Sequence, residues 1–290
     1  MNNIKVDKRK NSSHLFLQIK HDFYMGTIEG WKKYIVVLFI FIFLCSIFQM
    51  EFINIKKYEG FIQSPNTADY IIHMFRGMRI FEGNNVELYT KLPQWFLINI
   101  FLSFVVGYYP LKDLKEFGPQ MLIRSKKRWQ WWFSKCIWVI CNVIFYYLIG
   151  YGVSIVFSLF NGGMSLIPTS EINKIISDVD TISFGAKEVI YIGMILPIVT
   201  SIALSLMQLV ISLFSNSIIS NMVIIILVLI SAFYCNSFII GNYIMILRSN
   251  TIIGVEGTNS LEGMILSLLI SLVSIFVGTF KFNKYDILNK

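Results

Sequence analysis

Charged residues are scarce in this chain of 290 residues. Asp, Glu, Lys and Arg make up only 14% of it, whereas hydrophobic residues reach 55% and the mean hydropathy is +0.63. An average soluble domain carries about 25% charged residues. The deficit of charge therefore indicates that lipid, rather than water, surrounds most of the chain.

Residues that carry chemistry are equally few. The histidines His14, His21 and His73 show no metal-ligand spacing, and the four cysteines fall in or beside apolar runs, where cysteine acts as a small hydrophobe. No G-x-x-x-x-G-K-[ST] phosphate loop occurs, so the chain lacks the means to hydrolyse ATP. Ionisable residues are absent from the middle of every apolar run, which argues against an ion pump or proton relay and against an intramembrane protease or acyltransferase. We expect no enzyme activity, no cofactor and no metal.

Long apolar runs are what the sequence has in abundance. About 20 helical residues cross the hydrocarbon core, and six runs fit: 34–53, 94–111, 136–160, 189–214, 218–240 and 262–280. These runs do not alternate as barrel strands do. The sequence therefore predicts an all-α integral membrane protein with a tail and interfacial helix over 1–33, a six-span transmembrane domain over 34–280 and a tail over 281–290.

The distribution of Lys and Arg predicts the orientation of these spans. Segments 1–33, 112–135 and 281–290 together carry 17 basic residues, and the loops on the other side carry 8. An excess of Lys and Arg marks the cytoplasmic side of a membrane. We therefore expect both termini in the cytoplasm, as an even number of spans requires, and the chain in the cell membrane.

The stretch MLIRSKKRWQWWFSKCIW, residues 121–138, combines basic and aromatic side chains. Such a pattern suits either a nucleic-acid strand or the edge of a membrane. Nucleic acid would need a soluble domain to present it, and no segment is large enough. We therefore expect no nucleic-acid partner and predict an interfacial anchor on membrane lipid, made of Arg124, Lys126, Lys127, Arg128, Trp129, Trp131 and Trp132.

The segment HLFLQIKHDFYMGTIEGWKK, residues 14–33, is amphipathic. Steps of four residues place Leu15, Ile19 and Phe23 on one stripe, with Lys20 and Asp22 off it. This pattern predicts a helix that lies in the membrane interface just before the first span.

The loop after the second span has a pattern of its own. PLKDLKEFGPQ begins at Pro110, allows one or two helical turns and breaks at Gly118-Pro119. It suits either a plain connector or a docking knob for a soluble partner.

The amphipathic start and the stretch IRSKKRWQWWFSK resemble the permease subunits of ABC-2-type ABC transporters. The stretch is similar to the (L/I)-R-S-x-(S/K)-R-x-x-W-(W/F)-x-x-K pattern of small Gram-positive peptide and bacteriocin exporters. The resemblance implies the type V exporter layout, a second copy or homologous permease as a partner, and a cytoplasmic ATPase dimer. It further implies an ATPase-contacting coupling loop, with Glu116 as the main polar contact and a second contact between spans four and five: Lys112, Asp113, Leu114, Lys115, Glu116, Phe117, Gly118, Gln120, Ser215 and Asn216.

Uncharged polar and aromatic side chains occur within the spans. They suit either hydrogen bonds that pack helices together or a weakly polar path for an amphipathic cargo, and the possible path residues are Asn142, Tyr146, Tyr147, Gln208 and Asn221. On the outer side, 66–83 and 168–188 suggest amphipathic helices. The resemblance implies that 241–261 dips back into the membrane.

These observations lead to two functional hypotheses. The first is the permease of an ATP-driven exporter that moves amphipathic or antimicrobial peptides out of the cell. The second is a membrane immunity or signalling subunit that transports nothing and binds a cytoplasmic partner through the same loop. An ATPase that copurifies with the chain and responds to it would distinguish the first from the second.

Overall fold

The computed structural model describes residues 15–59, 63–80, 87–116, 128–182 and 184–283. In these ranges every regular element is a helix, and the only extended pairing is an isolated bridge between Ser249 and Thr258. The prediction of an all-α protein is therefore confirmed.

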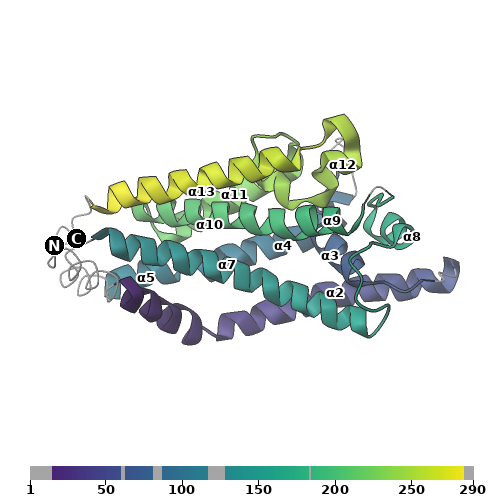
Figure 1. Cartoon of the computed structure of the whole chain (residues 1–290), viewed down its shortest axis with the longest axis horizontal. Coiled ribbons are helices and arrows are strands. Elements are labelled where there is room, and N and C mark those ends of the chain that lie inside the picture. The colour runs from purple at the N-terminus through teal and green to yellow at the C-terminus, as the bar shows by residue number, and fades with distance from the viewer. Residues whose placement is uncertain (1–14, 60–62, 81–86, 117–127, 183, 284–290) are drawn as a thin grey trace, which may run out of the picture.

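The long helices lie side by side along the longest axis of the molecule (Figure 1). The two ends of the described chain, residue 15 and Asn283, lie at the same end of this bundle. Five stretches are long and apolar enough to cross a membrane. Three of them lie in single helices: Lys32–Lys57 in α2 (Lys32–Glu59), all of α7 (Arg128–Leu159) and all of α13 (Ser260–Asn283). The other two run through consecutive helices: Gln94–Glu116 through α4 (Glu87–Gly107) and α5 (Tyr109–Glu116), and Ala186–Phe214 through α9 (Ala186–Glu188), η3 (Val189–Ile195) and α10 (Leu196–Phe214).

The fifth predicted span, 218–240, is shorter than its apolar run. Helix α11 covers Ser217–Phe233, whereas the run was expected to be helical to residue 240. Its 17 residues give a length of about 26 Å, against about 30 Å for the hydrocarbon core. The chain leaves the helix at Tyr234, which adopts an extended conformation, and continues into the buried turns η4 (Ile240–Ile244) and η5 (Ile246–Arg248).

The third predicted span begins earlier than expected. Helix α7 starts at Arg128 rather than at residue 136, so the tryptophan-rich stretch forms its first two turns. The apolar run alone marks residue 136 because Ser134 and Lys135 interrupt the hydrophobic pattern, yet both are buried against other helices.

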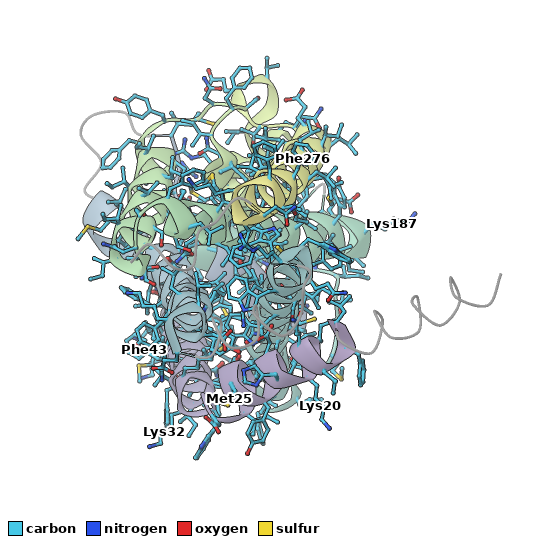
Figure 2. The ribbon with its side chains drawn as sticks, turned by 90° about the vertical axis from the view of Figure 1, so that its left-hand side faces the viewer. Lys20, Met25, Lys32, Phe43, Lys187 and Phe276 are labelled. Carbon is cyan, nitrogen blue, oxygen red and sulfur yellow. The ribbon has the colours of Figure 1, made fainter. Side chains whose placement is uncertain are left out.

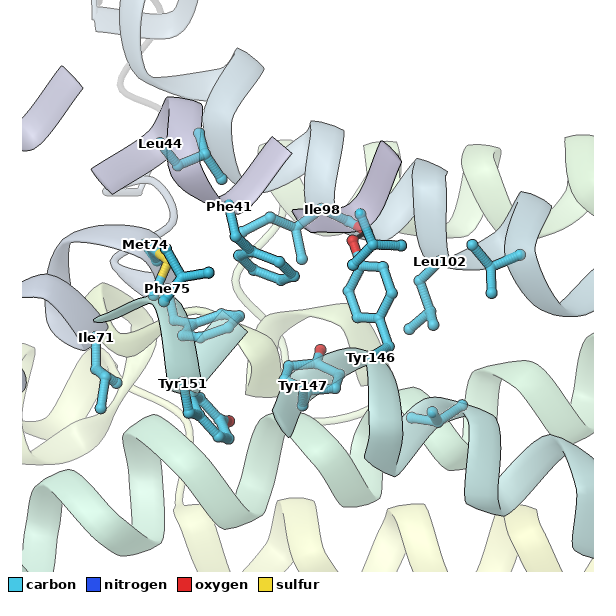
Figure 3. Packing of buried hydrophobic residues seen from close by; sticks show 14 of the residues in the cluster. Phe41, Leu44, Ile71, Met74, Phe75, Ile98, Leu102, Tyr146, Tyr147 and Tyr151 are labelled. Carbon is cyan, nitrogen blue, oxygen red and sulfur yellow. Dashed lines mark hydrogen bonds between the residues drawn. The ribbon is translucent and has the colours of Figure 1, made fainter. Parts of the chain in front are cut away.

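Aromatic side chains dominate the packing between the helices. Phe41 of α2 meets Tyr146 of α7 edge-on, with ring centroids 5.3 Å apart, and Phe75 of α3 (Thr67–Phe75) stacks on Tyr147 at 5.5 Å. Figure 3 shows these four rings gathered in one layer of the core. Aromatic pairs of this kind add about 0.5–1.5 kcal/mol to the burial of their area.

Within the segment 66–83, for which an amphipathic helix was expected, α3 packs inside the molecule. Every residue of α3 is buried, and its first turn is closed by a capping box in which Asp69 Oδ2 accepts from Asn66 N at 2.9 Å. Asp69 Oδ1 also accepts from Thr169 N at 2.8 Å and from Asn173 Nδ2. Burial raises the pKa of the Asp69 carboxyl, and these three hydrogen bonds oppose the rise. Asp69 therefore ties α3 to the segment 168–188.

The segment 168–188 is not one helix. It forms the short turns α8 (Ser170–Ile172), η2 (Asn173–Ser177) and α9, and it breaks at Asp178, which has the left-handed φ of 58°. At the same end of the bundle the Arg248 guanidinium is buried and donates to the carbonyl oxygens of Met78, Arg79 and Ala232 at 2.8–2.9 Å. Buried side-chain hydrogen bonds thus hold together the connections at this end.

Gly278 sets the closest approach between α13 and α7. A Cβ added there would overlap the indole ring of Trp132, whereas one added at Gly152 on α7 would meet nothing within 4 Å. We expect Gly278→Ala to destabilise the protein by about 1–3 kcal/mol, since overpacking forces helices apart. Gly152→Ala is the matched control and should stabilise the protein by about 0.5–1 kcal/mol, since Ala favours a helix more than Gly does. Thermal unfolding of the detergent-solubilised protein measures both, and equal midpoints for the two variants would contradict this packing.

Candidate functional site

The N-terminal helix, residues 15–23, lies across the end of the bundle where the chain ends meet (Figure 2). Its buried face is not the apolar stripe expected from the sequence. Gln18, Asp22 and Gly26 point inward at steps of four residues, whereas Phe16 and Tyr24 are exposed. The helix therefore turns a carboxylate toward the other helices and leaves large apolar side chains on its outer surface.

Gly26 allows this close contact. It lies in a π-helical turn, η1 (Tyr24–Ile28), and a Cβ at this position would come within 2.6 Å of Trp138 Nε1 and 2.8 Å of Tyr109 Cδ1. The missing side chain lets the segment approach α7 and α5 at the same time. Asp22, one turn earlier, is thereby carried into the interior.

The short helix α5 has one buried face and one exposed face. Asp113 and Leu114 are buried, and Lys112, Lys115 and Glu116 are exposed. Asp113 and Leu114 were expected among the ATPase contacts, and both face the interior of this copy of the chain. The exposed face keeps the other three charged residues available to a partner.

Lys135 of α7 connects these two segments. Its side chain is 1% exposed, and its Nζ contacts Asp22 Oδ1 of the N-terminal helix and, at 2.6 Å, Asp113 Oδ2 of α5. Nζ also lies 4.6 Å from the centre of the Tyr109 ring and 4.9 Å from that of Trp131. One ammonium group therefore joins three segments that are far apart in sequence.

Neutral donors complete the site. Tyr109 OH donates to Asp22 Oδ1 at 2.9 Å, and Ser134 Oγ donates to Asp22 Oδ2. Trp131 Nε1 donates to Asp113 Oδ2 at 3.2 Å, and His21 Nε2 lies 3.2 Å from Asp113 Oδ1. We call the set Asp22, Asp113 and Lys135, with His21, Tyr109, Trp131 and Ser134, the Lys135 cluster.

Burying the charged groups of the Lys135 cluster costs free energy. Asp22 and Asp113 are each 3% exposed, and taking an ion out of water has an effective cost of several kcal/mol. Paired charges with their remaining lone pairs hydrogen-bonded recover that cost, while a lone buried charge does not. The cluster is therefore stable only when all three segments are in place.

The same residues include a possible metal-ligand set. One ligand atom from each of His21, Asp22 and Asp113 falls within 4.8 Å of the others. The Lys135 ammonium, however, contacts both carboxylates, and a divalent cation would have to displace it. The residues fit an internal ion pair better than a metal site.

The predicted interfacial anchor divides into two parts. Trp129 is exposed and Arg128 is half-buried, as an anchor requires, but Trp131 and Trp132 are buried. Trp131 stacks on Phe282 of α13 with centroids 4.6 Å apart, and Trp132 Nε1 donates to Ile275 O at 3.1 Å. These two rings pack α7 against α13 because α7 begins at Arg128. The remaining predicted anchor residues, Arg124, Lys126 and Lys127, lie outside the described residues.

The other coupling-loop residues fall in two places. Ser215 and Asn216 are exposed between α10 and α11, where Asn216 Oδ1 caps α11 by accepting from Ile219 N at 2.8 Å. This turn lies at the α5 end of the bundle, since Lys281 near the end of α13 sits over the Phe214 ring. Phe117, Gly118 and Gln120 lie outside the described residues.

The possible path residues are buried and hydrogen-bonded. Tyr147 OH pairs with Ser201 Oγ at 2.6 Å, and Tyr146 OH donates to Ile98 O at 2.9 Å. Asn142 accepts from Tyr34 OH, and Gln208 donates to Asn221 Oδ1. These contacts cross between helices and favour the packing interpretation within one copy of the chain.

Sequence reasoning missed Asp22 and Lys135 as partners. Each lies in an amphipathic or basic stretch in which a charge normally faces water or headgroups, and 113 positions separate them. One signal in the sequence could have pointed to a buried lysine. Lys135 ends the IRSKKRWQWWFSK stretch, and an apolar run follows it directly.

The fold and this site define a helical protein with helices long and apolar enough to cross a membrane and with an internal ion cluster at one end. The chain belongs to the family described as "Protein of unknown function (DUF2705)", whose model matches residues 60–288. No curated protein matches the chain, and no solved structure matches it.

Removing the Lys135 ammonium tests the ion cluster. We expect Lys135→Met to destabilise the protein by about 3–5 kcal/mol, because it leaves two buried carboxylates without their cation. Adding Asp22→Asn and Asp113→Asn to this variant should restore part of the loss. Lys115→Met, an exposed lysine on α5, is the control, and thermal unfolding in detergent is the measurement. Equal losses for Lys135→Met and Lys115→Met would show that the cluster does not stabilise the fold.

Proposed function

We propose that this chain is the permease subunit of an ATP-driven ABC exporter of the ABC-2 type, embedded in the cell membrane with both termini in the cytoplasm. The sides of the bundle support the membrane part of the proposal. Phe39, Phe43, Leu148 and Phe276 are among many large apolar side chains that are exposed (Figure 2). Soluble monomers rarely expose contiguous apolar surface on this scale, and lipid would cover it.

The observation that carries the proposal is how α5 is held. Its buried face is fixed by Asp113 to Lys135 of α7 and, through Lys135, to Asp22 of the N-terminal helix. Its exposed face presents Lys112, Lys115 and Glu116. A partner that binds this face would therefore move α5, α7 and the N-terminal helix together, as a coupling helix must when an ATPase changes shape.

The exposed turn at Ser215 and Asn216 lies at the same end of the bundle and supplies a second point of contact. Two separated contacts fix the orientation of a partner better than one. The proposed partner is a cytoplasmic ATPase dimer, bound by two copies of this chain or by this chain and a homologous permease.

The proposed cargo is an amphipathic peptide. The buried polar groups between the helices include the amides of Asn142, Gln208 and Asn221 and the hydroxyls of Tyr146 and Tyr147. None of them is a charge that would fix a small ion, and all are hydrogen-bonded within the chain. Because these groups are hydrogen-bonded within one copy, we place the path between two permeases.

Exchanging the two charges at the end of α5 tests the coupling surface. In Lys115→Glu/Glu116→Lys, net charge and helix length are kept, but the charge pattern offered to a partner is reversed. We expect stimulation of an ATPase that copurifies with the parent protein to fall roughly tenfold, since the loss of a few polar contacts weakens an interface by about 1–3 kcal/mol. Purified subunits reconstituted in vesicles give the hydrolysis rate.

The matched control for this exchange is Lys20→Glu, a charge change at an exposed position of the N-terminal helix. Its hydrolysis rate and membrane abundance should equal those of the parent protein. An unchanged rate in the exchanged variant would remove α5 from coupling. If no ATPase associates with the parent protein at all, the immunity or signalling alternative takes its place.

A transport assay tests the cargo. A strain without this gene should retain more of a cationic amphipathic peptide and be more sensitive to it than the parent strain. Lys135→Met expressed in that strain should restore less resistance than Lys20→Glu, a change at an exposed position outside the coupling surface, when both are present at equal abundance. Equal retention and sensitivity across a broad peptide panel would reject peptide export.

A further inference from the structure

A cavity of 420 Å³ lies beside the Lys135 cluster, between the turn that follows the N-terminal helix, α4 and α5. Its walls include Gly26 and Glu29 of the turn, Lys33 at the start of α2, Phe104 of α4, Tyr108 between α4 and α5, and Lys112 of α5. Ligand pockets commonly enclose roughly 300–1,000 Å³. Neither the packing of the helices nor the proposed ATPase contact accounts for this cavity.

Lys33 gives the cavity its chemistry. Its Nζ donates to Gly26 O at 2.8 Å and to Val105 O at 3.3 Å, and it lies 4.8 Å from the centre of the Trp138 ring. An ammonium group has three donors, so one remains for a ligand once the two carbonyls are bound. The carbonyls hold this ammonium at the cavity wall instead of letting the side chain extend into solvent.

The balance of charge favours an anion. Lys33 and Lys112 supply two positive charges to the cavity, and Glu29 supplies one negative charge. Tyr108 also lines it, and its hydroxyl group can donate a hydrogen bond. A phosphodiester, with one negative charge and several acceptor oxygens, complements this set.

The apolar wall identifies the kind of anion. Phe101, Phe104 and Val105 line the cavity on the side of α4, and the Phe104 ring is 52% exposed. They belong to a stretch long and apolar enough to cross a membrane. A phosphate held at Lys33 would therefore have its attached hydrocarbon chains directed along α4, whereas a soluble anion would leave this wall unused.

We propose that this cavity binds the headgroup of one anionic phospholipid, with the phosphate at Lys33 and Lys112 and the acyl chains along Phe101 and Phe104. The bound lipid would contact both the turn after the N-terminal helix and α5. The Lys135 cluster joins the N-terminal helix to α5 from the other side. This proposal requires only that the chain resides in a membrane and is independent of any ATPase.

Lipid binding to the purified, delipidated protein tests this site by native mass spectrometry. Phosphatidylglycerol should bind roughly tenfold more tightly than phosphatidylcholine, since the latter has the same phosphodiester but adds a choline cation that Lys33 and Lys112 repel. Lys33→Gln and Lys112→Gln should each reduce that preference by a similar factor. Lys32→Gln removes the same charge one residue away, at an exposed position that does not line the cavity, and should keep the preference.

Three outcomes would overturn the proposal: equal binding of the two lipids, equal losses in Lys32→Gln and Lys33→Gln, or full competition by soluble glycerol phosphate, which would indicate a soluble anion. Because Lys33 also bonds two backbone carbonyls, its variant could be misfolded. The side chain of the exposed Lys112 makes no hydrogen bond to the backbone in the described residues. Lys112→Gln with an unchanged unfolding temperature therefore keeps the test decisive.

Discussion

The contact of one buried ammonium group with two carboxylates is the interaction on which this end of the molecule depends. Lys135 lies on α7, Asp113 on α5 and Asp22 on the N-terminal helix, and each is at most 3% exposed. None of these charges is stable at that depth without the others. The ion cluster thus joins three segments that are distant in sequence. Apolar and aromatic packing holds the rest of the bundle together.

Five of the six predicted spans lie in helices long and apolar enough to cross a membrane, because each is a long apolar run. The sequence does not reveal the ion cluster, because that cluster depends on partners that are distant in sequence. Hydrophobic periodicity places Asp22 on a polar face, but the absence of a side chain at Gly26 brings that face against α7. Likewise Lys135 appears to end a basic loop, although α7 begins at Arg128 and carries it inside. The end of α11 was mispredicted for the opposite reason. Residues 234–240 are still largely apolar, although the helix has already ended at Phe233.

The arrangement offers a physical account of how an outside event could reach the membrane helices. A partner on Lys112, Lys115 and Glu116 acts on α5, and the cluster passes that displacement to α7, whose Trp132 is packed against α13 at Gly278. An anionic lipid in the neighbouring cavity would act on the same N-terminal turn and the same α5. In the proposed exporter, the ATPase and the membrane lipid therefore influence one rigid unit from two sides.

The distance between the N-terminal helix and α5 tests most directly whether they form one unit. Spin labels at the exposed positions Lys20 and Lys115, attached through non-natural amino acids so that the four native cysteines stay in place, report this distance by electron paramagnetic resonance. A single narrow distribution in the parent protein that broadens in Lys135→Met is the expected result. A distribution that is already broad in the parent, or one that Lys135→Met leaves unchanged, would contradict the account.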